Sequence, residues 1–88
     1  MIVVEATTEF ERHFANLPAL VRRQAHKKWI LFCENPFHPS LNTEKLHPKR
    51  RELWSFRINK QYRIVFRFLD GSTVLFLTCG PHSWIYRF

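Results

Sequence analysis

Hydrophobic residues in the first 36 positions follow helical spacing after one short β-branched run. Residues 2–4 (Ile-Val-Val) predict a first strand. Thr8 followed by Glu11 is a capping-box pattern, which predicts the start of a helix. Pro18 breaks that helix and suits the first turn of another, so a helical hairpin is expected to end at residues 35–36. The expected apolar faces are Phe10, Phe14 and Leu17 in the first helix, and Val21, Ala25, Trp29 and Phe32 in the second.

Residues 36–51 show no regular period. This segment contains three prolines and two leucines, Leu41 and Leu46, which we expect to anchor it to the core. A structureless connection of this length is uncommon in a compact domain and is usually functional. We therefore predict a functional loop here.

From Leu53 onward the hydrophobic period changes from that of a helix to that of a strand. Apolar and polar residues alternate over residues 54–58 and 62–68, and a third strand is expected over residues 73–79. Asp70-Gly71 is a strong signal for a two-residue hairpin turn. The predicted fold class is α+β, with one domain over residues 1–88. It comprises a strand, a helical hairpin, a three-stranded antiparallel meander packed on the helices, and a short C-terminal helical turn.

The apolar faces of the predicted strands fix their pairing, because residues opposite each other share a face of the sheet. In the first hairpin this places Phe56 opposite Ile64 and Trp54 opposite Phe66, around the odd loop 59–61. Arg57 then lies directly opposite Arg63. Two like charges in this position destabilise a sheet by a few tenths to about 1 kcal/mol, and an anion bound between them would reverse the effect.

The third strand is expected to complete this arrangement. A two-residue turn at Asp70-Gly71 sets Phe68 opposite Thr73, Ile64 opposite Leu77 and Arg63 opposite Thr78. Thr78 would then share a row with the two arginines, at the strand end that leads into residues 80–82. We therefore expect an anion site at this end of one sheet face.

The net charge of +7 comes from one segment, residues 45–67. Its only acid is Glu52, and its basic residues are Lys45, Lys49, Arg50, Arg51, Arg57, Lys60, Arg63 and Arg67. A basic patch localised in this way is typical of a protein that binds nucleic acid. The alternative is a solvated basic face that maintains solubility.

The remaining composition limits the other possibilities. Eighty-eight residues are enough for one domain, and 45% hydrophobic residues indicate a globular chain. The two cysteines, Cys33 and Cys79, have no zinc-ligand spacing and are expected to be free thiols, so no metal or other cofactor is predicted. We see no signal peptide and no run of transmembrane length, which favours a cytoplasmic protein without membrane contact.

The C-terminus carries the candidate acid–base chemistry. His82 and Tyr86 are four residues apart and would share one face of a helical turn. Histidine exchanges protons near neutral pH, so beside two arginines it suits RNA cleavage by the 2′-hydroxyl, which needs a base, an acid and cations at the phosphate. The alternatives are a structural histidine at a helix start, a packing tyrosine and solvated arginines.

These residues together resemble a known family. Residues 53–59 (LWSFRIN), 62–66 (YRIVF) and the terminal Gly80-x-His82-x-x-x-Tyr86 are similar to the RelE/ParE toxin superfamily of type II toxin–antitoxin modules. The resemblance covers nearly the whole chain. It implies a compact α+β fold, a cognate acidic antitoxin, and one of two activities. RelE-like members cut mRNA without a metal, usually on the ribosome, whereas ParE-like members inhibit DNA gyrase.

The resemblance also implies roles for individual residues. Arg57 and Arg63 match the arginines that hold phosphate, and His82 and Tyr86 match the C-terminal catalytic positions. The expected RNA contacts are Lys45, Lys49, Arg50, Arg51 and Arg67. Apart from the resemblance, Glu44 and Glu52 are alternative candidates for the base, and a salt bridge to a neighbouring arginine is the other interpretation of Glu52. We expect a ribosome-dependent mRNA endoribonuclease, with a gyrase inhibitor and a degenerate, non-catalytic toxin as the alternatives.

Overall fold

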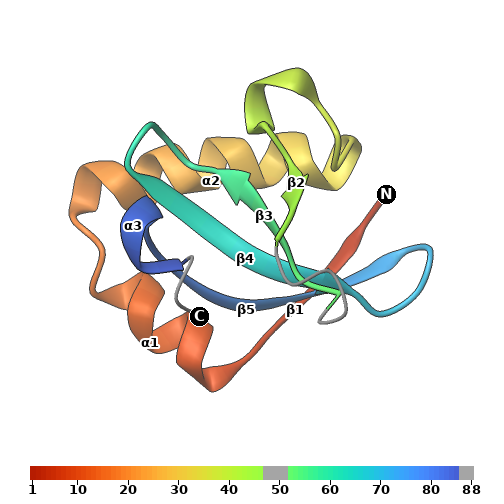
Figure 1. The fold of residues 1–88 in the computed structure, drawn as a ribbon, viewed down its shortest axis with the longest axis horizontal. Helices are drawn as coiled ribbons and strands as arrows, with labels where there is room; N and C mark the ends of the chain where they lie inside the picture. The colour runs from red at the N-terminus through yellow and green to blue at the C-terminus, as the bar shows by residue number, and fades with distance from the viewer. Residues whose placement is uncertain (47–51, 86–88) are drawn as a thin grey trace.

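The described part of the chain, residues 1–46 and 52–85 of a computed structural model, has a twisted sheet with two helices on one side (Figure 1). The elements in chain order are β1 (Val3–Ala6), α1 (Thr8–Ala15), α2 (Ala19–Glu34), the 3₁₀ turn η1 (Pro39–Leu41), β2 (Glu44–Lys45), β3 (Trp54–Arg57), β4 (Tyr62–Phe68), β5 (Thr73–Pro81) and α3 (His82–Ile85). The expected α+β class is confirmed.

The sheet has five strands in the order β1-β5-β4-β3-β2. Strands β3, β4 and β5 form the predicted antiparallel meander. β1 joins it in parallel beside β5, and β2 pairs antiparallel with β3 at the other edge. β2 was not predicted, because two residues are too few to show a strand period. It forms within the segment that we expected to be irregular.

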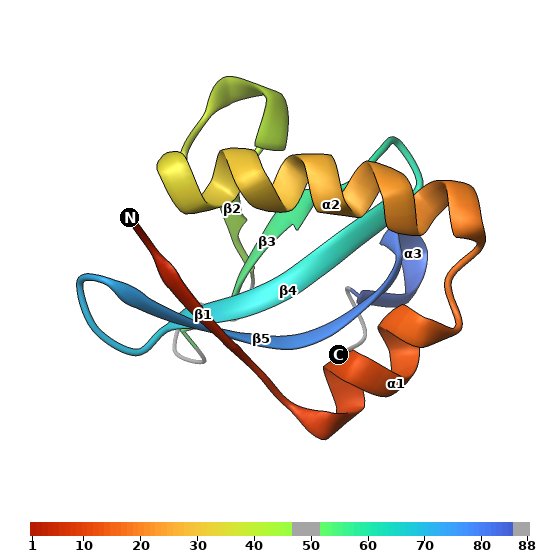
Figure 2. The same ribbon diagram turned by 180° about the vertical axis from the view of Figure 1, so that it is seen from behind.

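Both helices cover the same face of the sheet, which Figure 2 shows from behind. Phe32 of α2 is fully buried, and its ring lies 4.7 Å from that of Phe56 and 4.9 Å from that of Phe66. The rings of Phe10 and Phe14 on α1 contact Trp29 on α2, and Phe14 also contacts His26. The later residue of α1, Phe14, thus reaches the earlier residue of α2, His26, so the two helices are antiparallel, as expected for a helical hairpin.

The first helix begins one residue earlier than predicted. Thr7, not Thr8, is its N-cap, and the Thr7 hydroxyl accepts a hydrogen bond from the backbone N–H of Phe10 at 3.0 Å. The same hydroxyl donates to the carbonyl oxygen of Leu77 at 2.8 Å. Thr7 therefore caps α1 and also fixes it to β5, a long-range bond that the local capping pattern does not reveal.

The register between β3 and β4 is as predicted. Trp54 pairs with Phe66, Phe56 with Ile64 and Arg57 with Arg63. The backbone N–H of Ile58 donates to the carbonyl oxygen of Tyr62, which closes the loop at residues 59–61. The opposition of the two arginines is therefore confirmed.

The predicted register between β4 and β5 is wrong. Phe68 pairs with Val74, Ile64 with Cys79 and Arg63 with Gly80, so Thr78 lies opposite Val65. Two features cause the difference. The turn is longer than two residues, since Leu69 N–H donates to the Thr73 carbonyl at 2.9 Å, and a bulge shifts the ladder between Val65 and Phe66.

The connection after α2 is anchored as expected. Leu41 is fully buried and Leu46 is 5% exposed. The imidazole Nδ1 of His38 accepts from the backbone N–H of Ser40 at 3.1 Å and so caps η1. Within the described residues, every helix is too short or too polar to span a bilayer.

Candidate active site

The face of the sheet opposite α1 and α2 carries the candidate site. Phe56, Ile64 and Phe66 point to the helices, so their neighbours along β3 and β4 point the other way. On this second face a smaller apolar cluster forms from Leu46, Val65 and Ile85. Polar residues are grouped around this cluster.

Two rows of paired residues cross this face. One row contains Arg57, Arg63 and Gly80, and the other contains Glu44, Ser55, Val65 and Thr78. Glu44 is thus the diagonal neighbour of Arg57. Diagonal neighbours in a sheet lie roughly 7–8 Å apart, within reach of long side chains. The register places one carboxylate and two guanidinium groups on one face.

The second row is unusual because it buries hydroxyl groups. Ser55 and Thr78 are fully buried on either side of Val65. Among the described residues, neither hydroxyl has a hydrogen-bond partner, and the Nε of Arg57 is also buried without one. Buried polar groups are normally satisfied, so three unsatisfied groups close together set this part of the face apart from an ordinary packed sheet.

The two arginines differ in their surroundings. Arg63 is only 6% exposed, and its Nη1 donates to backbone carbonyls of the β3–β4 loop. Its acceptors are the carbonyl oxygens of Asn59 at 2.7 Å, Tyr62 at 3.2 Å and Lys60 at 3.5 Å. Arg63 therefore holds the loop as well as adding charge, whereas Arg57 is more exposed.

The same loop positions His82. The backbone N–H of His82 donates to the carbonyl oxygen of Gln61 at 2.5 Å. Asn59 stiffens the loop, since its Oδ1 accepts from the backbone N–H of Gln61 at 2.8 Å and of Tyr62 at 2.9 Å. Its amide nitrogen donates to Gln24 of α2 at 2.8 Å. The loop thus links Arg63 to the start of α3.

His82 lies beside an open pocket of about 380 Å³. Its lining residues are Lys60, Gln61, Tyr62, Pro81, His82 and Ser83. His82 is exposed, as is Lys60, whose ammonium group gives this pocket a cation. Lys60 belongs to the basic segment, residues 45–67, but its sequence pattern predicts no individual role for it. Its position in the loop between the two arginines was the available signal.

Two predicted RNA contacts lie in different surroundings. Lys45 forms an ion pair with Glu52 at 3.1 Å, and its Nζ lies 5.8 Å from the ring centroid of Trp54. Because Lys45 pairs with Trp54, it lies on the opposite face from the arginine pair. Arg67 is exposed on the same face of the sheet as Arg57 and Arg63, which we call the arginine face. It lies four residues along β4 from Arg63, a distance of roughly 13 Å along the strand.

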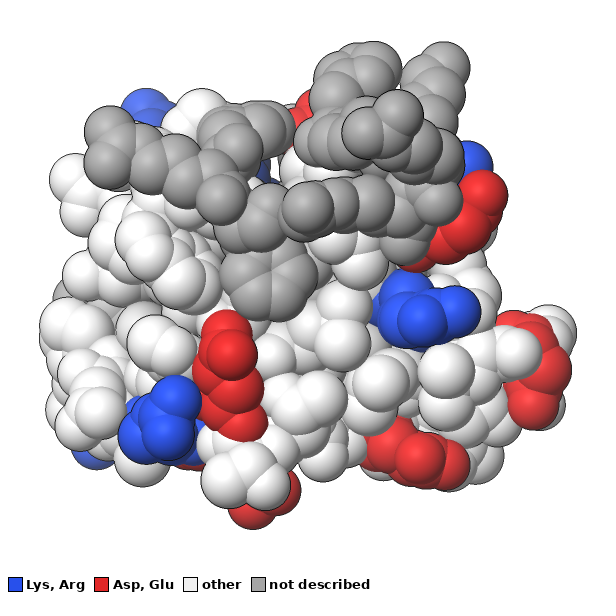
Figure 3. Space-filling model, turned by 60° about the horizontal axis from the view of Figure 1, so that its bottom comes forward, with Lys and Arg blue, Asp and Glu red and all other residues white. Residues whose placement is uncertain are grey.

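The other predicted contacts, Lys49, Arg50 and Arg51, lie outside the described residues, as does Tyr86. Figure 3 shows one side of the molecule, where positive and negative side chains are interspersed between larger uncharged areas. The described residues contain no group of three or more His, Cys, Asp and Glu side chains that would suit a metal ion.

Comparison with known proteins places this fold in a family. Residues 34–82 match the sequence model of the HigB-like toxin family. This family is described as the RelE-like toxin of the type II toxin–antitoxin system HigB. An uncharacterized protein of Haemophilus influenzae is 37% identical over 46 residues, which is 52% of this chain. The match spans 45% of the length of that protein.

Solved structures show the same fold at low identity. The YoeB/ParE toxin from Agrobacterium tumefaciens has a TM-score of 0.73 and 20% identity, over 93% of this chain and 99% of that one. YafQ from E. coli has a TM-score of 0.72 and 11% identity, over 98% of this chain and 99% of that one. A chain of the archaeal RelE–RelB complex from Pyrococcus horikoshii has a TM-score of 0.72 and 16% identity, over 94% of this chain and 97% of that one.

The matched residues 34–82 include β2, β3, β4, β5 and His82, the elements that build the arginine face. The chain therefore belongs to the family of RelE-like toxins of type II toxin–antitoxin systems.

Proposed function

We propose that this protein is an endoribonuclease that cleaves mRNA on the ribosome and so inhibits translation. The observation that carries the proposal is the shared face of Glu44, Arg57 and Arg63, linked by the β3–β4 loop to His82. A protein that only binds gyrase needs no such combination of carboxylate, guanidinium and imidazole groups.

The chemistry is transesterification by the RNA itself. A base removes the proton of a 2′-hydroxyl, whose oxygen then attacks the adjacent phosphorus. The bond from phosphorus to the 5′-oxygen breaks, and an acid protonates that oxygen. The products are a 2′,3′-cyclic phosphate and a 5′-hydroxyl. Arg57 and Arg63 stabilise the negative charge that develops on the phosphate oxygens.

His82 and Glu44 are the groups that we assign to proton transfer. His82 borders the open pocket with Lys60, where it can reach the 5′-oxygen as the acid. Glu44 projects from the edge strand β2 onto the arginine face and is the proposed base. Tyr86 stays a candidate for substrate positioning. No metal ion is required by this set of side chains.

An acidic antitoxin is the proposed protein partner. The net charge of +7 favours a negatively charged partner, which would cover the same basic groups that bind RNA. Several of the similar structures are complexes of this kind, including RelBE from E. coli and YoeB–YefM from Staphylococcus aureus. We infer that such a partner blocks the arginine face of this toxin.

Primer extension on cellular transcripts after brief expression tests the nuclease activity. We expect new 5′ ends within coding regions, which disappear from a transcript whose start codon is removed, because ribosomes no longer present it. Growth arrest with intact transcripts, together with loss of negative supercoiling in a plasmid, would instead support the gyrase inhibitor.

Glu44→Gln is expected to lower transcript cleavage by about 100-fold, because the substitution removes the general base and keeps the side-chain shape. The measurement is primer extension at matched protein levels. Glu52→Gln is the matched control: among the described residues it breaks the exposed ion pair with Lys45, so cleavage should change less than twofold. The reverse order of effects would transfer the role to Glu52.

A further inference from the structure

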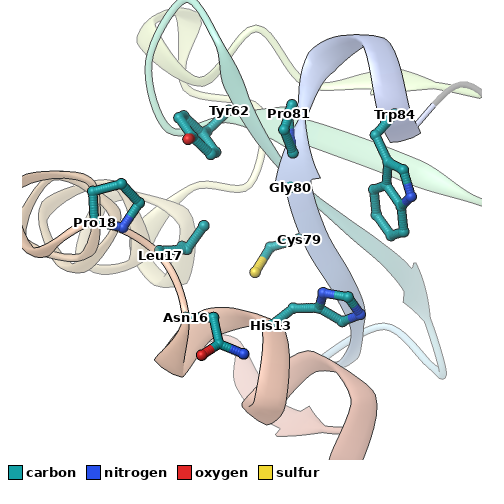
Figure 4. Close-up of a pocket in the computed structure, with 9 residues that line it drawn as sticks. All are labelled: His13, Asn16, Leu17, Pro18, Tyr62, Cys79, Gly80, Pro81 and Trp84. Carbon is teal, nitrogen blue, oxygen red and sulfur yellow. The ribbon is translucent and has the colours of Figure 1, made fainter.

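A second pocket lies where α1 meets the end of β5, outside the arginine face. It has a volume of about 330 Å³, near the lower end for ligand sites and suited to a group the size of one nucleobase. Figure 4 shows its lining residues: His13, Asn16, Leu17, Pro18, Tyr62, Cys79, Gly80, Pro81 and Trp84.

Aromatic rings form much of this pocket. The rings of His13 and Trp84 lie 5.5 Å apart with an interplanar angle of 39°, and Tyr62 lines the pocket from β4. Gly80 allows this arrangement, because a Cβ there would lie 2.9 Å from Cε3 of Trp84. Planar rings with an apolar floor are the surfaces on which unpaired RNA bases stack.

The side chain of Asn16 gives the pocket hydrogen-bonding groups that could distinguish one base from another. Asn16 follows α1, and its side-chain amide offers both a donor and an acceptor. Such an amide can pair with the edge of a base. Cys79 adds no reactive group, because burial raises the pKa of its thiol to about 12.

The pocket adjoins the candidate active site. Tyr62 and Pro81 line both this pocket and the one that contains His82 and Lys60. A nucleotide whose base enters the α1–β5 pocket would therefore have its phosphate near the Lys60 ammonium and the His82 ring. The apolar pocket suits the base of a nucleotide, and the adjoining cationic pocket suits its phosphate.

We propose that the α1–β5 pocket binds one base of the RNA beside the cleaved phosphodiester and contributes to sequence preference. This inference rests on the proposed function, since it supplies a specificity subsite for the same reaction. An apolar side chain of the antitoxin is the other occupant that the pocket would accept. The neighbouring cation and imidazole favour a nucleotide.

Titration with the four ribonucleoside 5′-monophosphates tests the pocket directly, with ribose 5-phosphate as the probe that lacks a base. The protein carries His82→Ala, so that cells survive its expression, and binding is followed by NMR. We expect at least one nucleotide, but not ribose 5-phosphate, to shift the signals of His13, Asn16 and the Trp84 indole. Shifts confined to the neighbouring pocket at Lys60 and position 82, or no shifts, would overturn the proposal.

Variants then identify the contacts. His13→Ala and Asn16→Ala should each raise the Kd for that nucleotide about tenfold, because a stacking ring or a base contact is lost. Asn16 has ordinary right-handed helical backbone angles, so alanine fits there without strain. His26→Ala, which also removes a histidine with ring contacts to Phe14 and Trp29, should leave the Kd unchanged.

Cleavage assays separate the failure of this inference from that of the proposed function. In the active chain, Asn16→Ala should keep cleavage but change the base preference at one position next to the cut. Unchanged preference and unchanged Kd, with cleavage still dependent on His82, would overturn the base pocket and leave the nuclease intact. Loss of antitoxin binding in His13→Ala with an unchanged nucleotide Kd would assign the pocket to the antitoxin.

Discussion

Replacing His82 with alanine is expected to lower transcript cleavage by about 10²–10⁴-fold and to relieve growth arrest. His82 borders the pocket beside Lys60 and is the proposed acid, and its backbone is fixed to the β3–β4 loop by its bond to Gln61. Primer extension and growth after induction measure the two effects.

The loss should be chemical rather than structural. His82 is exposed, so the free energy of unfolding should change by less than about 0.5 kcal/mol, which denaturant unfolding can verify. His38→Ala is a matched histidine control, because His38 only caps η1. If cells that express His82→Ala stop growing as before, while transcripts stay intact with either protein, the nuclease proposal fails.

The register of β3 and β4 could be predicted because the core decides it. Trp54, Phe56, Ile64 and Phe66 must all face the helices, and a shift of one residue would move every one of them to the other face. The opposition of the arginines follows from that constraint, although the arginines themselves give no pairing signal. The sequence therefore predicted this strand pairing, and with it the opposition of Arg57 and Arg63, correctly.

The register of β4 and β5 could not be predicted in the same way, because it depends on local turn chemistry. The carboxylate of Asp70 accepts hydrogen bonds from the backbone N–H groups of Ser72 and Thr73, each at 2.8 Å. The bond from Ser72 lowers the pKa of Asp70. These bonds stabilise a longer turn than Asp-Gly suggests, and the bulge then shifts Thr78 opposite Val65.

The short strand β2 was also not predicted from the sequence, and its position decides between Glu44 and Glu52 as the proposed base. Two paired residues cannot establish a period in a sequence, so Glu44 and Glu52 both stayed candidates for the base, with a salt bridge as the other interpretation of Glu52. Pairing with Ser55 places Glu44 on the arginine face, whereas Lys45 turns the other way and binds Glu52. The alternation of a strand thus separates the proposed base from a surface ion pair.

Arg57→Gln is expected to lower cleavage by about 10²–10³-fold without loss of stability, because one donor to the developing phosphate charge is removed. Relief of the repulsion from Arg63 should leave the free energy of unfolding unchanged or raise it by up to about 1 kcal/mol. Primer extension and denaturant unfolding measure the two quantities on the same protein.

Arg63→Gln is the matched comparison, and its effects should differ in kind. Its Nη1 donates to three loop carbonyls, so the substitution should lower the free energy of unfolding by about 1–3 kcal/mol as well as cleavage. The loop that fixes His82 would loosen at the same time. A destabilised Arg57→Gln, or one that still cleaves RNA normally, would mean that the strand pair is structural. In that case phosphate binding would have to come from Lys60 and the residues beyond the described face.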